Sequence, residues 1–118
     1  MKPPKVEDLM KRPVYHIEAT ATVQEALQEM DEKGTKKILV KDGQKPIGVL
    51  EKWMVTKSDY QRQVKQMDLR PFGKAPLGTL VPDIENELVS YPAVYIYNPE
   101  SPNEFEGVIT TYDLVRAY

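Results

Sequence analysis

The feature that most constrains the fold of this chain is an internal repeat of a strand-to-helix sequence. The stretch PIGVLEKWMV (residues 46–55) aligns with FEGVITTYDLV (residues 105–115), and Gly48 and Gly107 are 59 positions apart. Apolar residues follow both glycines, and Trp53 aligns with Tyr112. Repetition at this scale indicates a duplicated supersecondary unit, because one copy alone cannot bury the apolar face of its sheet.

The first half of the chain predicts a β-α-β-β-α order. VYHIEAT (14–20) is typical of a short strand, and TVQEALQEMDEKG (22–34) predicts a helix that begins at a Thr22/Glu25 capping box and ends at Gly34. Residues 36–51 predict two strands joined by an Asp42-Gly43 turn. We expect residues 52–67 to form a second helix.

The second half repeats this order in a shorter form. DLRPFGKAP (68–76) contains proline and glycine and predicts a connector. We expect a helix over 79–90, a strand over 91–98, a loop over 99–104, a strand over 105–110 and a closing helix over 111–118. The predicted fold is α+β, with two β-α-β-β-α repeats (about 6–67 and 77–118) packed about a pseudo-two-fold axis and the second repeat truncated.

Composition excludes several classes of protein and site. The chain of 118 residues has no cysteine, which excludes disulfide scaffolds and thiolate metal sites and favours a cytoplasmic location. A net charge of −2 gives no attraction to nucleic acid or membranes. His16 is the single histidine and no nucleophile is paired with it, so we expect no enzyme activity and no metal site.

The strongest candidate for a binding site is the corner between the last strand and the closing helix. A strand that turns into a helix leaves free backbone N–H groups, which favour an anion. Thr110 adds a hydroxyl donor for a phosphate oxygen, and Asp113 can accept hydrogen bonds from two neighbouring ribose hydroxyls. Gly107 allows close approach of a ligand or backbone. The alternative is that Thr110 and Asp113 form a structural capping box.

A β-α-β-β-α unit that is repeated, with the second copy ending in G-h-h-T-x-x-D-h, where h is apolar, resembles the cystathionine β-synthase (CBS) domain, whose tandem pairs are Bateman modules. VEDLMKRPVYHIEATATVQEALQEMDEKGTKKILV, near the start, resembles the opening of a CBS domain in the same order of elements. The resemblance implies a regulatory module without catalytic activity. It also implies binding of AMP, ADP, ATP or S-adenosylmethionine between the copies as a regulatory ligand, with no required cofactor.

The resemblance assigns roles to residues of the second copy. Thr110 is expected near phosphate, and Asp113 is expected on the ribose hydroxyls. A base pocket is expected beside them, and the full set of expected ligand-binding residues is Thr110, Asp113, Gly107, Ile109, Pro76, Tyr91, Pro92 and Ala93. The first copy has Glu51 and Met54 at the motif positions. A carboxylate repels phosphate, and a thioether cannot hold ribose hydroxyls, so we expect one site per chain.

Two other functions stay open at this level. The same fold can serve as a ligand-free structural or dimerisation module, and the resemblance implies a homodimer and a regulated protein partner. Residues 52–74 contain six Lys or Arg against two Asp, which could attract a nucleic-acid backbone weakly. We favour a solvated helix face as the explanation of that excess, so we expect no nucleic-acid partner and no membrane partner.

Overall fold

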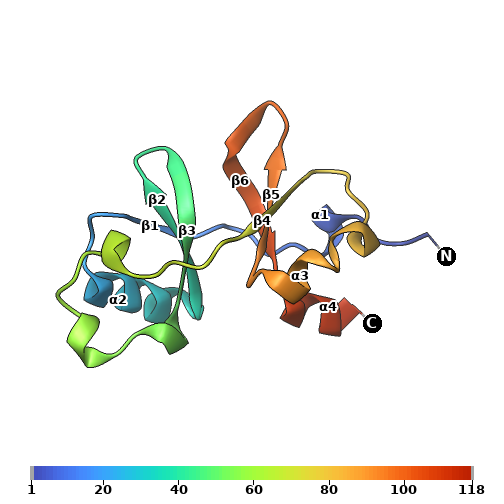
Figure 1. Ribbon diagram of the computed structural model, residues 1–118. Helices are drawn as coiled ribbons and strands as arrows, with labels where there is room; N and C mark the ends of the chain where they lie inside the picture. The colour runs from blue at the N-terminus through green and yellow to red at the C-terminus, as the bar shows by residue number, and fades with distance from the viewer. Residues whose placement is uncertain (1, 118) are drawn as a thin grey trace. The chain divides into compact units, whose positions relative to one another are not determined.

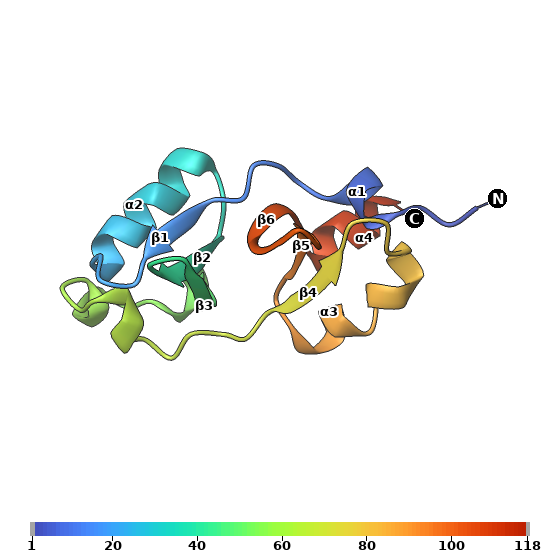
Figure 2. The same ribbon diagram turned by 90° about the horizontal axis from the view of Figure 1, so that it is seen from above.

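The chain forms two compact units in this computed structural model, which describes residues 2–117 (Figure 1). One unit is residues 15–71, and the other combines the chain up to Val14 with the chain from Phe72 onward. The boundary therefore differs from the expected division into 6–67 and 77–118, because residues 6–14 belong to the compact unit of the second repeat. Figure 2 shows α1 (Val6–Leu9, blue) beside α4 (Thr111–Ala117, red), and the two helices are in contact.

The unit of residues 15–71 is built on a three-stranded sheet covered by one helix. The sheet has the order β1 (His16–Glu18), β2 (Lys37–Asp42) and β3 (Lys45–Glu51), with β1 parallel and β3 antiparallel to β2. Figure 2 shows α2 (Val23–Lys33) along this sheet. The apolar side of α2 packs on the sheet through a core of Val23, Ala26, Met30, Ile38, Val40 and Leu50.

The helix and hairpin predicted for this unit are confirmed. The Glu25 N–H donates to the Thr22 hydroxyl (3.1 Å), and the Thr22 N–H donates to the Glu25 carboxylate (3.1 Å), which completes the capping box. Gly34 ends α2 at φ 66°, a left-handed conformation that favours glycine. Gly43, at φ 63°, occupies the turn between β2 and β3.

The predicted helix over 52–67 is wrong. The segment forms three short 3-10 turns, η1 (Lys52–Met54), η2 (Lys57–Asp59) and η3 (Val64–Gln66). Thr56 interrupts the helix, because its N–H donates to the Asp59 carboxylate (2.9 Å) and so begins a new turn. Farther along, the Val64 N–H donates to the Ala21 carbonyl (2.8 Å) and the Val64 side chain is fully buried in the core. Core burial therefore determines this path in place of helix propensity.

The second unit contains a sheet of the same topology. Its order is β4 (Gly73–Pro76), β5 (Val94–Asn98) and β6 (Ser101–Ile109), with β4 parallel and β6 antiparallel to β5. Helical segments η4 (Val81–Ile84) and α3 (Glu87–Ser90) precede β5, and α4 follows β6. The core joins α1, the helical segments and the sheet through Val6, Val81, Ile84, Leu88, Val94, Ile96 and Ile109.

Three predictions for this half are wrong in detail. The connector expected over 68–76 contains strand β4, because its backbone pairs with β5 as far as Pro76. The helix expected over 79–90 is broken into η4 and α3 around Asn86. Each of these two segments is shorter than the 11 residues of α2, which agrees with the predicted shortening of the second repeat. The loop expected over 99–104 lies largely in β6, which begins at Ser101 opposite Asn98.

The duplication is visible in the register of the strands. In the first sheet Val40 pairs with Gly48, and in the second Ile96 pairs with Gly107. The ladder has an irregularity directly after Val40 and directly after Ile96. Both sheets therefore have the same pairing and the same distortion at equivalent positions, which confirms the repeat that the sequence predicted.

Each of the two repeat glycines is covered by another segment of its own unit. A Cβ atom on Gly48 would lie 2.7 Å from Leu69 Cβ, and one on Gly107 would lie 2.8 Å from Met10 Cβ. The residue after each covering position forms a two-way backbone bridge: Arg70 with Val49 (2.8 and 2.9 Å), and Lys11 with Val108 (2.9 and 3.1 Å). Glycine is needed at both positions because any side chain would separate the bridging segment from the strand.

The helices of residues 2–117 include none with the length and apolar character that crossing a bilayer demands.

The first prediction concerns the capping box of α2. Replacement of Thr22 by Ala removes the side-chain acceptor for the Glu25 N–H and should lower the free energy of unfolding by about 1 kcal/mol, while Thr22→Ser keeps the acceptor and should cost much less. Urea denaturation of the three proteins measures the difference. Equal stability of the Ala and Ser variants would contradict the assigned cap.

The second prediction concerns the pH dependence of the same box. Hydrogen bonds from the Thr22 N–H and then the Thr22 hydroxyl lower the pKa of Glu25. The charged form stabilises the fold above the ordinary Glu pKa, and that contribution is lost as the pH falls through the lowered value. The stability advantage of the wild type over Glu25→Gln should therefore shrink between about pH 6 and about pH 3. An advantage that grows on acidification in denaturation experiments would contradict it.

Candidate functional site

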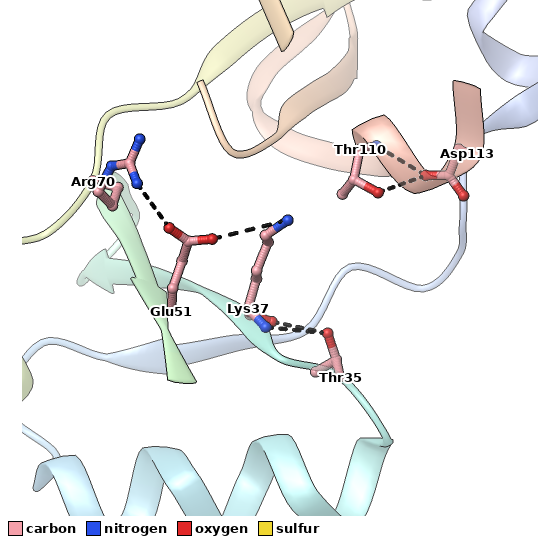
Figure 3. A network of polar contacts seen from close by, with 6 residues as sticks. All are labelled: Thr35, Lys37, Glu51, Arg70, Thr110 and Asp113. Carbon is pink, nitrogen blue, oxygen red and sulfur yellow. Dashed lines mark hydrogen bonds and ion pairs between the residues drawn. The ribbon is translucent and has the colours of Figure 1, made fainter. Parts of the chain in front are cut away.

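Thr110 and Asp113 lie together at the corner between β6 and α4. Thr110 directly follows β6, and Asp113 is in the first turn of α4 with only 4% of its surface exposed. The Thr110 N–H donates to Asp113 Oδ2 (2.9 Å), and the Thr110 hydroxyl donates to the same oxygen (3.3 Å), as Figure 3 shows. The N–H bond is one half of a capping box, and the Asp113 N–H donates to the Thr110 backbone carbonyl (3.0 Å). The backbone N–H of Thr110, one of those that could bind an anion at this corner, is therefore bonded to Asp113.

The second oxygen of Asp113 is paired with Lys11, a residue that sequence reasoning missed. Lys11 Nζ is 3.4 Å from Asp113 Oδ1, and the lysine side chain is 48% exposed. The sequence did contain a signal for this contact. Lys11 precedes Arg70 by 59 positions, the same offset as Gly48 and Gly107.

Asp113 also lines a hollow in the surface of its unit. The hollow has a volume of about 290 Å³ and is lined by Asp8, Leu9, Met10, Lys11, Asp113, Arg116 and Ala117. Two of its cations approach the exposed ring of Tyr112: Lys11 Nζ at 4.6 Å from the ring centre and the Arg116 guanidinium at 5.8 Å. The hollow therefore brings two carboxylates, the exposed Asp8 and the buried Asp113, and two cations to one place, a combination suited to hydroxyl and charged groups of a small ligand.

The structure places some of the other predicted residues at the same end of the sheet. Val94 at the start of β5 pairs with Ile109 at the end of β6, so Tyr91, Pro92 and Ala93 precede β5 at the end where Thr110 lies. Ala93 is buried, and its carbonyl accepts the Gly73 N–H (3.0 Å). Tyr91 and Pro92 are half-buried.

Three further predicted residues have other surroundings. The Ile109 side chain is fully buried in the core of its unit. Gly107 is covered by Met10. Pro76 pairs with Tyr97 at the other end of the sheet from Thr110, and its carbonyl accepts the Thr79 hydroxyl (2.8 Å). These positions give Ile109 and Gly107 a packing role beside the corner.

The equivalent corner of the first repeat contains a carboxylate held by two cations. Glu51 ends β3, is 5% exposed, and lies 59 positions before Thr110. Its Oε2 accepts a hydrogen bond from Arg70 (3.0 Å), and its Oε1 is 3.9 Å from Lys37 Nζ, as Figure 3 shows. Met54, at the position of Asp113, packs against the core. This corner is filled by the side chains of the protein itself.

Much of the positive charge in residues 52–74 is neutralised by acids. Lys52 pairs with Asp31 (2.8 Å), Arg62 with Asp59 (3.2 Å), and Arg70 with Glu51 (3.0 Å). Pairing of half of the six cations weakens the case for a nucleic-acid surface, which requires free charges along one face.

Comparison with known proteins identifies the fold. The family model of the CBS domain matches residues 6–59. Among solved structures, the chain is similar to a hemolysin-like protein containing a CBS domain from Oenococcus oeni PSU, with a TM-score of 0.81 and 18% identity over 97% of this chain and 89% of that one. It is similar to the CBS domain protein NE2398, with a TM-score of 0.82 and 19% identity over 98% of each chain.

A third similar structure contains ligands. It is the CBS domain pair of protein MJ0100 in complex with 5′-methylthioadenosine and S-adenosyl-L-methionine, with a TM-score of 0.82 and 14% identity over 98% of this chain and 96% of that one. Among curated protein sequences, none is similar enough to this chain to count as a match.

Residues 6–59 are therefore a CBS domain, and the chain has the fold of a CBS domain pair.

Proposed function

We propose that this protein is a regulatory module that binds an adenosine compound at the corner formed by Thr110 and Asp113. The observation that carries the proposal is the buried carboxylate of Asp113, which lines a hollow. One of its oxygens accepts hydrogen bonds from Thr110, and the other pairs with Lys11. Vicinal ribose hydroxyls can take the place of such donors without leaving the carboxylate unpaired. The adenosine compounds bound to the similar CBS pair of MJ0100 support this ligand class.

The ligand acts here as a signal and not as a substrate. CBS domain pairs are generally regulatory, and the single histidine, His16, lies exposed with its Nε2 4.0 Å from the Glu18 carboxylate. Binding of a ligand to the folded form stabilises that form, so occupancy of the site changes the population of conformations that a partner protein recognises.

We propose a single site per chain. In the first repeat the Glu51 carboxylate occupies the corner and is neutralised by Arg70 and Lys37. A nucleotide phosphate would have to displace that carboxylate from both cations, and Met54 offers no acceptor for ribose hydroxyls.

A ligand-free interaction module is the second candidate. Thr110 and Asp113 already satisfy each other as a cap, which needs no ligand. Large apolar side chains are also exposed, and Trp53, Val89 and Val115 are 72%, 86% and 71% accessible. Such side chains suit a homodimer contact or a regulated partner protein.

The third prediction tests ligand binding. AMP, ADP, ATP and S-adenosylmethionine are added singly, and a ligand at a hundred times its dissociation constant should stabilise the protein by about 2.7 kcal/mol and raise the melting temperature. Asp113→Asn keeps an acceptor for the cap but loses the charge, so it should abolish the shift. Asp59→Asn is the matched control, because Asp59 caps Thr56 and pairs with Arg62 in the same manner without lining the hollow. No shift with any of the four compounds would favour the ligand-free module.

The fourth prediction concerns stoichiometry. Titration calorimetry with the compound that gives the largest shift should show one site per chain, and Glu51→Gln should leave its affinity unchanged. Two equivalent sites, or loss of binding in the Glu51 variant, would contradict the assignment of the site to the second repeat.

A further inference from the structure

We propose that Lys11 binds the anionic group of the ligand and so makes the site prefer phosphorylated adenosine compounds to S-adenosylmethionine. The inference rests on the proposed function and adds to it the residue that sets ligand charge. Its basis is the first repeat, where Arg70 and Lys37 bind the Glu51 carboxylate at the equivalent corner.

Arg70 and Lys11 occupy equivalent positions in their units. Arg70 bridges Val49, the residue after Gly48, and Lys11 bridges Val108, the residue after Gly107. From this position the Arg70 guanidinium donates to the Glu51 carboxylate at 3.0 Å. A cationic side chain at this bridge position can therefore reach an oxyanion at the end of the strand that contains the repeat glycine.

Thr110 stands where Glu51 stands, and its side chain is shorter. In the first sheet Lys37 pairs with Glu51 and Ile38 with Leu50, while in the second sheet Val94 pairs with Ile109. Ala93 and Thr110, which follow next in that register, thus replace Lys37 and Glu51. The second corner lacks both long side chains, so it has no carboxylate of its own at the place of Glu51.

Lys11 is held beside that place. Its backbone is fixed to Val108 by hydrogen bonds of 2.9 and 3.1 Å, so only its side chain has to move. The ammonium group lies 3.4 Å from Asp113 Oδ1 and is about half exposed, so it can pair with Asp113 in the free protein and reach a phosphate oxygen in the complex.

Two carboxylates and two cations line the hollow, and both carboxylates accept a hydrogen bond within their own helix cap. Asp8 and Asp113 each accept a backbone N–H of the residue that caps their own helix, Lys5 at 2.9 Å and Thr110 at 2.9 Å. Lys11 and Arg116 share the ring of Tyr112, and Arg116 brings a second positive charge to the same hollow. S-adenosylmethionine carries a sulfonium, an ammonium and a carboxylate group and has a net positive charge, so these two cations attract it less than they attract a phosphate.

The first experiment compares adenosine, AMP and S-adenosylmethionine by calorimetry in three proteins. The wild type should bind AMP more tightly than the other two compounds. Lys11→Gln should weaken AMP binding about tenfold and change adenosine binding little, because it removes one charge-assisted hydrogen bond. Lys33→Gln is the matched control, since Lys33 also lies over a tyrosine ring, that of Tyr15, but has no place in the hollow.

Two results would overturn the inference while leaving the proposed function intact. One is a Lys11→Gln variant that loses the same factor for adenosine as for AMP, and the other is tighter binding of S-adenosylmethionine than of AMP by the wild type. If none of the three compounds binds, the proposed function fails, and a second experiment decides the role of Lys11.

That second experiment needs no ligand. Thr110→Glu places in the second repeat the carboxylate that the first repeat has at Glu51. If Lys11 is the equivalent of Arg70, then Lys11→Gln should lower the melting temperature more in the Thr110→Glu background than in the wild type, and Lys33→Gln should not. Equal effects of Lys11→Gln in the two backgrounds would show that Lys11 does not bind an oxyanion at this corner.

Discussion

Each unit of the structure depends on one short backbone bridge, Arg70 with Val49 or Lys11 with Val108, formed beside a glycine. In each unit, a segment from elsewhere in the sequence packs on the last strand at Gly48 or Gly107, where there is no side chain in the way. The segment then forms two backbone hydrogen bonds with the residue after that glycine, Val49 or Val108. The bridge fixes where that segment's next side chain begins, Arg70 in one unit and Lys11 in the other. Both cations thus begin from a backbone position that hydrogen bonds already hold.

At the corner of the second repeat, the proposed binding site would use the same atoms as the helix cap. A buried carboxylate requires hydrogen-bond donors in every state of the protein, because an unpaired charge in the interior is costly. Asp113 obtains them from Thr110 and Lys11 in the free protein. The two interpretations of T-x-x-D that the sequence left open therefore describe one arrangement, and only the donors on the outer oxygen would change with a ligand.

Local sequence patterns predicted the elements that local physics controls. The α2 helix was predictable because Thr22, Glu25 and Gly34 define both of its ends, and the hairpin was predictable from Gly43. The segment 52–67 was not, because its backbone satisfies its hydrogen bonds through Thr56 and Ala21 instead of a helical ladder. Strand β4 was missed since only its pairing with β5 makes it a strand.

The site was predictable in its motif and not in its surroundings. Thr110 and Asp113 were found because they follow a repeated glycine, but Lys11 lies about a hundred residues earlier and reaches them only through the bridge to Val108. Pro76 was placed by resemblance alone, and the strand register puts it at the far end of the sheet. The positions of Lys11 and Pro76 depend on backbone pairing between residues distant in sequence, and the periodicity of apolar residues does not predict that pairing.

The division of the chain into units also bears on how such a protein arises. Val6 belongs to the core formed by residues from Phe72 onward, and Val64 fills the corresponding role in residues 15–71. The segment of residues 6–14 thus packs with residues that follow it in sequence by more than 55 positions. An ancestor with a single copy would have lacked the later residues on which the segment 6–14 packs. A second molecule would have had to supply that core, so gene duplication would have turned an association between two chains into a contact within one chain.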